Sequence, residues 1–203
     1  MMTVILVSMS LLSGVAFGFH YVGMEDMRYL EWLITGALGV LVMAAGIDIG
    51  INWSVVVKLA RKGIQVLMVP ILVTVGSLIG AVLGGMFFSM NIWESLAIGG
   101  AISWYSLAGP VTTQIAGPEL GTINFLTNWM REFMAFLFVP FIARYIGFLP
   151  TIGPGGATTM DSTLPIITKY TNPATSTIAF FNGFVTGALP PILIPFFLKM
   201  AGY

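Results

Sequence analysis

Four polar residues that could do chemistry lie within one apolar stretch of the chain: Asn124, Asn128, Arg131 and Glu132. Offsets of four, seven and eight residues place them on one stripe of an α-helix. A carboxylate and a guanidinium among Phe, Leu and Met side chains are costly in lipid unless the stripe faces protein or water. The spacing therefore predicts a stripe that faces a bundle interior. It could hold either an ion pair that joins helices or a binding site.

A second carboxylate favours the binding site. Asp161 lies in TTMDSTLP, between the hydroxyls of Thr159 and Ser162 and just before Pro165, which a helix cannot pass undisturbed. Capping a short helix is the alternative role for Asp161. Two carboxylates near the bilayer midplane would attract a proton, a sodium ion or an ammonium group. Free backbone amides at broken helix ends would suit a carboxylate.

Other residues are weaker candidates for the same site. Trp104 and Tyr105 could stack on a cationic stem, a contribution of roughly 0.5–2 kcal/mol, although aromatic residues often serve only in packing. A helix kink expected at Pro190 and Pro191 would free backbone carbonyls, which Asn182 could help to satisfy or which could coordinate a cation. Asp48 lies near the end of an expected span, where an interfacial role is the simpler interpretation.

The composition excludes most soluble functions. The 203 residues are 57% hydrophobic and 8% charged, whereas soluble domains carry about 25% charged residues. Eight basic and eight acidic residues leave no basic face for nucleic acid. With no cysteine and only His20, a metal site is not expected. An enzyme is also not expected, because no base is placed to activate Ser106 or Ser162.

The remaining class is an all-α polytopic membrane protein, because each span needs roughly 20 apolar residues. We expect about five full transmembrane helices and two re-entrant or broken hairpins. The basic patch of Lys58, Arg61 and Lys62 places the N-terminus inside and the loop 20–31 outside. The expected full spans cover residues 2–19, 32–49, 64–90, 121–145 and 174–198, with a connection at 51–63.

The second half of the chain contains an internal duplication. Two phrases that begin with Gly-Gly-Ala, at 99–109 and 155–165, are each followed by a Pro-Phe phrase with a basic residue, at 140–148 and 195–203. This pattern indicates two structural repeats. The predicted domains are scaffold-like helices at 1–92, transport repeat 1 at 93–148 and transport repeat 2 at 149–203.

The two repeats are expected to be inverted. The polar segment 152–170 is too short to cross lipid and return, so we expect it to dip into the membrane and back. If residues 95–118 form a similar dip, broken around Ser106 to Pro110, then Arg144 and Lys169 both lie in the cytoplasm, as the positive-inside rule prefers. Antiparallel repeats of this kind are typical of secondary transporters. A rival topology makes both dips full spans and puts Arg144 outside.

Three phrases together resemble one family: WYSLAGPVTTQIAGPELGT at 104–122, N-x-x-R-E at Asn128 to Glu132, and GGATTMDSTLPI at 155–166. They resemble the LysO-type lysine exporters, most strongly over residues 99–197. The resemblance implies export of L-lysine, and of analogues such as thialysine, across the cytoplasmic membrane of a prokaryote. It implies antiport with protons, or with Na+, as the coupling ion and no other cofactor. By motif, the family's two essential acids fall on Glu132 and Asp161.

One departure from the family pattern is expected to matter. The chain looks like the large C-terminal half of a split exporter, which implies a small companion subunit of about 95 residues, room for roughly three spans. Whether two copies form a homodimer, and whether lysine is preferred over arginine or ornithine, the sequence leaves open. The alternative function is a passive pore or holin-like component of a two-subunit system.

Overall fold

The structure is a computed structural model that describes residues 2–21, 27–60 and 63–203. The chain forms two compact units, residues 1–41 and 42–203. All regular structure in the described residues is helical, which confirms the predicted all-α class.

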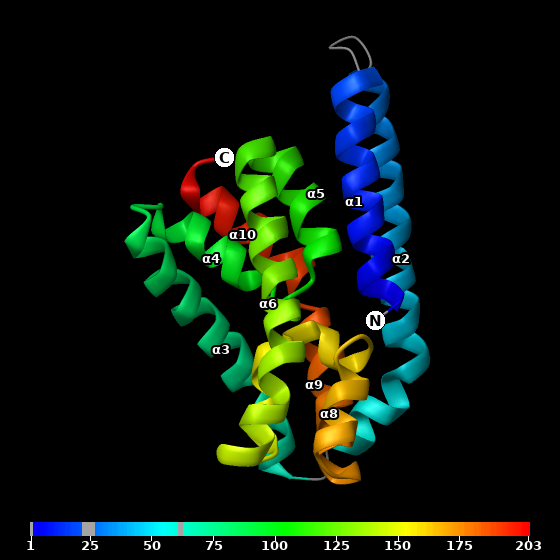
Figure 1. The fold of residues 1–203 in the computed structure, drawn as a ribbon, viewed down its shortest axis with the longest axis vertical. Coiled ribbons are helices and arrows are strands. Elements are labelled where there is room, and N and C mark those ends of the chain that lie inside the picture. The colour runs from blue at the N-terminus through cyan, green and yellow to red at the C-terminus, as the bar shows by residue number, and fades with distance from the viewer. Residues whose placement is uncertain (1, 22–26, 61–62) are drawn as a thin grey trace. The chain divides into compact units, whose positions relative to one another are not determined.

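The first unit contains α1 (Met2–Tyr21) and the first part of α2 (Met27–Ala60). Figure 1 shows these two helices side by side and antiparallel. The prediction of a connection at 51–63 is wrong for most of its length, because α2 continues as one helix of 34 residues to Ala60. No glycine or proline interrupts residues 51–60, so nothing in that stretch breaks the helix. Arg61 and Lys62 lie outside the described residues, as does the side chain of Asp48.

The second unit carries the residues of interest. After α2 it contains α3 (Ile64–Phe87), a first hairpin of α4 (Ile92–Gly100) and α5 (Tyr105–Ala116), and the long helix α6 (Pro118–Tyr145). A second hairpin follows, and its elements are η1 (Leu149–Thr151), α7 (Ile152–Gly155), η2 (Gly156–Met160) and α8 (Leu164–Tyr170). The chain ends in α9 (Pro173–Gly187) and α10 (Pro190–Ala201).

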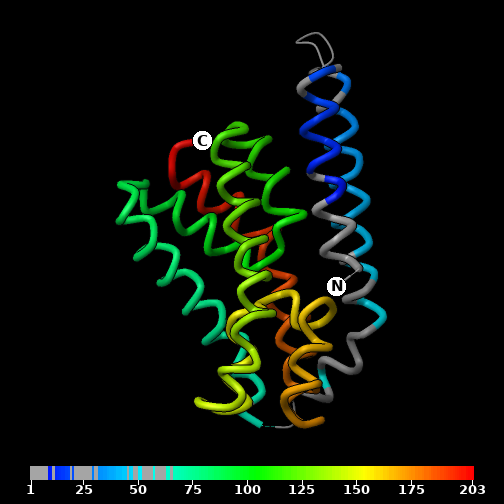
Figure 2. Tube along the Cα trace, viewed as in Figure 1, coloured from blue at the N-terminus to red at the C-terminus, as the bar shows by residue number. Residues whose placement is uncertain are grey.

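The two hairpins enter the second unit from opposite ends. Figures 1 and 2 show that α5 ends beside the start of α6 at one end, whereas α8 ends beside the start of α9 at the other. Each hairpin therefore enters and leaves the unit at the same end. The helix α6 and the α9–α10 pair run in opposite directions between these ends. The tip of each hairpin lies near the middle of the unit (Figure 1).

The helix ends follow local sequence signals. Asn91 and Asn172 cap α4 and α9, with side chains that accept from the backbone amides of Trp93 and Thr175. The kink expected at the Pro190–Pro191 pair is confirmed, since α9 and α10 meet at a bend of 43°.

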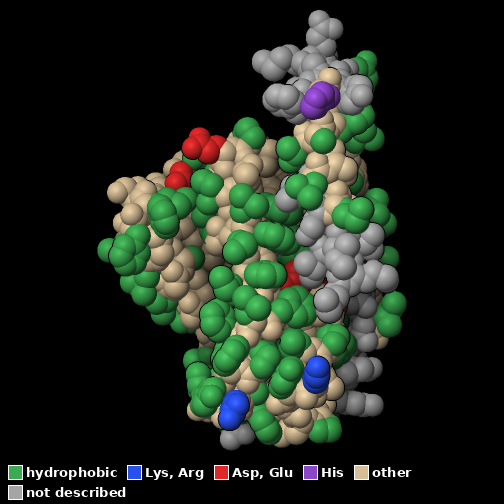
Figure 3. Space-filling view, in the orientation of Figure 1, with side chains coloured by type: hydrophobic (Ala, Val, Ile, Leu, Met, Phe, Trp, Pro, Cys, Tyr) green, Lys and Arg blue, Asp and Glu red, His purple; other side chains and the backbone are tan. Residues whose placement is uncertain are grey.

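Among the described residues, one single helix, Val66–Phe87, is long and apolar enough to cross a bilayer. The bent α9–α10 pair passes the same test when it is taken as one span. The charges in the second unit are few. Arg144 and Lys169 lie in the last turns of α6 and α8, and the face in Figure 3 shows basic side chains only at that end. Lys199 instead lies in the last turn of α10, near the C-terminus at the other end (Figure 1).

Candidate functional site

The first hairpin breaks at residues 101–104, between α4 and α5. Ile102 and Ser103 adopt left-handed backbone angles, with φ of 47° and 73°, which end α4. The expected break around Ser106 to Pro110 is therefore wrong. Pro110 lies inside α5 and removes only one backbone hydrogen bond there, whereas the actual break depends on a tertiary contact that sequence spacing does not reveal.

That tertiary contact is with the tip of the second hairpin. The backbone N–H of Ala157 donates to the carbonyl of Ile102 at 2.9 Å. Gly156 makes this approach possible: its φ is +56°, and a Cβ on it would lie 2.5 Å from the Ile102 oxygen. The two unwound tips therefore touch each other directly in the middle of the unit.

Beside this contact, α6 presents a buried polar face of Asn124, Asn128 and Glu132. The Oδ1 atom of Asn128 accepts the backbone N–H of Ser103 at 2.8 Å, and its Nδ2 donates to the Ile98 carbonyl at 3.1 Å. Asn128 Nδ2 also lies 2.8 Å from Asn124 Oδ1. Asn128 thus fixes both sides of the break in the first hairpin, which satisfies backbone groups that the break leaves without helical partners.

Arg131 does not share this face. Its guanidinium donates to the carbonyls of Pro154 and Gly153, at 3.0 and 3.1 Å, and to the Ser77 hydroxyl at 2.6 Å. Ser77 in turn donates to the Gly99 carbonyl at 2.7 Å. Adjacent helix positions differ by about 100°, so Arg131 and Glu132 project from opposite edges of the predicted stripe. These three partners of Arg131 are neutral oxygens, and they join α6 to α3 and α7.

Glu132 faces the second hairpin. Its side chain is 2% exposed, and its Oε1 accepts a short hydrogen bond from the hydroxyl of Ser162. Asp161 Oδ1 accepts from the backbone N–H of Ser162 and lies 3.2 Å from the same hydroxyl. One serine hydroxyl therefore lies between the two carboxyl groups, and since it has one proton, it can donate to only one of them at a time.

Three of the remaining predicted residues lie at the start of α5. The Tyr105 hydroxyl lies within hydrogen-bonding reach of Glu132 and within electrostatic reach of Asp161. Its ring packs edge-on against Phe125, with ring centroids 5.5 Å apart. Trp104 precedes α5 and is half-buried, whereas Ser106 is exposed on α5.

Thr159 and Asn182 belong to the second hairpin's own support. Asn182 Nδ2 donates to the Gly156 carbonyl and to Thr159 Oγ1, both at 3.0 Å. The Thr159 hydroxyl lies 2.8 Å from the Ala179 carbonyl. These contacts hold the tip of the second hairpin against α9. Asp161 does not cap α8: Thr163 occupies the N-cap position and makes no side-chain cap bond.

Sequence reasoning missed Ser103 and Thr112. Ser103 is fully buried at the break, and Thr112 accepts from Asn124 Nδ2 at 2.8 Å. Gly99 and Gly100, just before the break, are the sequence signal for it, because paired glycines permit close approach of neighbouring helices.

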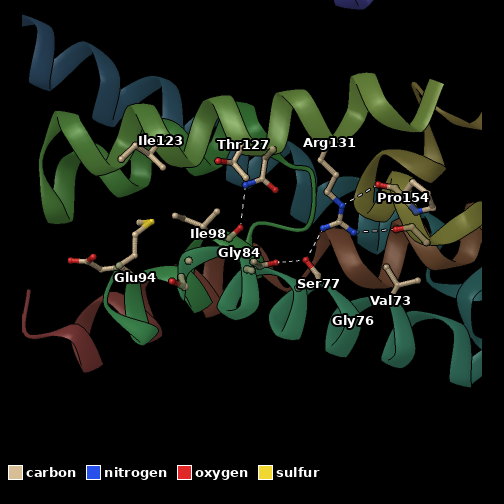
Figure 4. Close-up of a pocket in the computed structure, with 18 of the residues that line it drawn as sticks. Val73, Gly76, Ser77, Gly84, Glu94, Ile98, Ile123, Thr127, Arg131 and Pro154 are labelled. Carbon is tan, nitrogen blue, oxygen red and sulfur yellow. Dashed lines mark hydrogen bonds between the residues drawn. The ribbon is translucent and has the colours of Figure 1, made fainter. Parts of the chain in front are cut away.

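A cavity of about 1630 Å³ lies on the Arg131 side of α6. Figure 4 shows α3 along one wall, where Ser77 is hydrogen-bonded to Arg131 of α6. Asn128 and Arg131 line it, whereas Glu132 and Asp161 do not. Glu132 is therefore buried away from this cavity, next to the second hairpin, and Asp161, which Ser162 links to it, is exposed.

Known proteins are similar to this chain in sequence. The family described as "Lysine exporter LysO" matches residues 8–198. A "Putative lysine exporter" of Haemophilus influenzae is 40% identical over 134 residues, which cover 66% of this chain and 68% of that protein. The "Lysine exporter LysO" of Escherichia coli is 30% identical over 195 residues, which cover 94% of this chain. No solved structure shows significant similarity to the chain.

The chain spans less than two thirds of the Escherichia coli relative, since the match covers 64% of that protein. The family match nevertheless extends over nearly the whole chain, and it includes both hairpins and the helices between them. The chain therefore belongs to the lysine exporter LysO family.

Proposed function

We propose that this chain is the large part of a secondary-active exporter of L-lysine and of close analogues such as thialysine. The observation that carries the proposal is the cluster of Glu132, Ser162 and Asp161, in which two carboxyl groups from different elements share one hydroxyl. Such a cluster suits a cation, because carboxylates without a basic partner are costly in an apolar setting and gain most from a positive ligand.

In the proposed cycle, lysine enters from the cytoplasm and its ammonium groups pair with Glu132 and Asp161. The substrate carboxylate meets free amides at the start of α5, where the unwound segment ends and the positive end of the helix dipole lies. Protons from outside then neutralise the two acids, which lowers the affinity for lysine and releases it. Alternating access needs such a difference in affinity between two states, and protonation supplies it.

The membrane arrangement is part of the proposal. The chain would lie in the cytoplasmic membrane of a prokaryote as a multi-pass protein, with about five full spans and the two hairpins dipping in from opposite faces. Repeats at 93–148 and 149–203 would move against helices of 1–92. Arg144 and Lys169 at one end of the second unit, against Lys199 at the other, support this, because basic residues favour the cytoplasmic side.

A small companion subunit is also part of the proposal. The Escherichia coli relative is longer than the matched region by about a third of its length. A separate small membrane protein of about 95 residues, with room for roughly three spans, would supply the corresponding helices.

Transport in liposomes tests the proposal. The chain and its companion would be reconstituted, loaded with labelled lysine and placed under an imposed pH gradient. We expect saturable efflux that follows the gradient, and loss of that efflux in Asp161→Asn while the protein stays folded. Lysine flux that ignores both the pH gradient and a sodium gradient, or that does not saturate, would indicate a pore and refute the carrier.

A further inference from the structure

Three buried side-chain oxygens in the described residues meet no donor at regular hydrogen-bond geometry: Ser103 Oγ, Glu132 Oε2 and Asn182 Oδ1. Their side chains are 0%, 2% and 0% exposed. The Tyr105 hydroxyl lies within reach of the Glu132 carboxyl group and is the side-chain donor available to it besides Ser162. Buried polar atoms without a partner are rare in folded proteins, and each one calls for a physical explanation. All three can accept a hydrogen bond or coordinate a cation.

A path of hydrogen bonds and chain neighbours links these three oxygens through the crossing of the two hairpins. Ser103 follows Ile102, whose carbonyl accepts the N–H of Ala157. The residue before Ala157 is Gly156, whose carbonyl accepts from Asn182. On the other side, Ser103 N–H donates to Asn128, one helical turn before Glu132. The unpartnered oxygens therefore come from the three elements that meet at this contact: the first break, α6 and α9.

The two repeats carry an asparagine at corresponding positions. Asn128 and Asn182 follow Gly99 and Gly155 by similar intervals, 29 and 27 residues. Both are buried, and both donate to a backbone carbonyl of their own hairpin. In the first repeat the amide oxygen accepts the N–H of Ser103, but in the second repeat the amide oxygen accepts nothing. Asn182 Oδ1 of the second repeat is thus left as an acceptor for a ligand, whereas the corresponding oxygen of Asn128 is occupied by the backbone N–H of Ser103.

We propose that Ser103 Oγ, Glu132 Oε2 and Asn182 Oδ1 form an ammonium subsite at the crossing of the hairpins. A primary ammonium group has three N–H donors and one positive charge. The subsite has three acceptors, of which one belongs to a carboxylate. This inference rests on the proposed lysine transport and deepens it, because it names two positioning oxygens, from Ser103 and Asn182, that act beside the acid.

The sharpest test is Ser103→Ala. The Ser103 hydroxyl makes no hydrogen bond within the protein, and the backbone N–H that binds Asn128 is kept. Removing an unpaired hydroxyl should leave the melting temperature unchanged. Lysine binding, measured by calorimetry on the full chain in lipid nanodiscs, should weaken about 10- to 100-fold, the range for one hydrogen bond to a charged group. Cadaverine, which has the ammonium groups but no carboxylate, should lose affinity by the same factor.

Ser95→Ala is the matched control. Ser95 is also buried, but its hydroxyl donates to the Asn91 carbonyl, away from the crossing. This variant should lower the melting temperature and leave lysine affinity unchanged. Ser103→Gly removes the same hydroxyl and relieves the positive φ of 73°, so it should reproduce the loss of affinity even if Ser103→Ala folds poorly.

The outcomes separate this subsite from the proposed function. If the wild type binds lysine and both Ser103 variants bind it equally well, the subsite is wrong and the export proposal stands. If Na+ strengthens lysine binding in the wild type but not in Ser103→Ala, the oxygens hold an alkali cation and the ammonium assignment is overturned. A wild type that binds neither lysine nor cadaverine would overturn both proposals.

Discussion

Substituting Gly156 by alanine should separate the two hairpin tips. The residue has a φ of +56° and ψ of −125°, a conformation that costs an L residue about 1–3 kcal/mol. The new Cβ would lie 2.5 Å from the Ile102 oxygen and 2.9 Å from its Cγ2, so the tips must move apart. Movement breaks the Ala157 to Ile102 hydrogen bond and leaves two buried backbone groups unpaired, at about 1–3 kcal/mol. We expect a total loss of about 2–6 kcal/mol in the free energy of unfolding.

Unfolding in mixed detergent micelles measures this loss, and two other glycines separate its causes. Gly117 has a φ of +91°, and a Cβ added to it would meet nothing within 4 Å, so Gly117→Ala should carry only the backbone cost of about 1–3 kcal/mol. Gly153 has an ordinary φ and free space, so Gly153→Ala should be neutral or slightly stabilising. If Gly156→Ala and Gly117→Ala differ by less than about 0.5 kcal/mol, the contact between the tips is not what Gly156 provides.

Three further predictions concern the supports of the site. Asn172→Ala removes the cap that accepts from Thr175 N–H at 2.8 Å, and should cost about 1 kcal/mol in thermal unfolding; an unchanged melting temperature would contradict this. Arg131→Gln and Ser77→Ala remove parts of one hydrogen-bond chain, so their effects on unfolding should be non-additive by about 0.5–3 kcal/mol, and strict additivity in a double-mutant cycle would refute the link. Glu132→Gln keeps an oxygen for the Ser162 hydroxyl and should stay folded but lose lysine binding, whereas full binding by the variant would remove Glu132 from the site.

Sequence spacing is enough to predict the all-helical class, the buried face at Asn128 and Glu132, and the bend at Pro190. These features depend on local periodicity and on proline chemistry, which act within a few residues. Whether Asp161 and Glu132 serve transport stays a prediction, although the structure brings them to one serine.

The position of the first break could not be predicted, because a partner from another part of the chain decides it. Pro110 is the stronger local signal, yet α5 accommodates it, and the chain turns at Ile102 and Ser103. These residues accept left-handed angles because Asn128 and Ala157 pair with their backbone groups. Likewise, periodicity places Arg131 near Glu132 on a helical wheel but cannot say that its long side chain reaches the carbonyls of Gly153 and Pro154.

The most direct test of the account is cross-linking of the two hairpin tips in native membranes. The chain has no cysteine, so Ile102→Cys with Ala157→Cys introduces a single pair. The backbone contact of 2.9 Å between these residues brings their Cα atoms near the range for a disulfide, about 4.4–6.8 Å. After mild oxidation and denaturation, we expect both thiols to be protected from a maleimide-coupled polymer until a reductant is added. Two thiols that stay fully reactive after oxidation would contradict the meeting of the hairpins on which the proposed site depends.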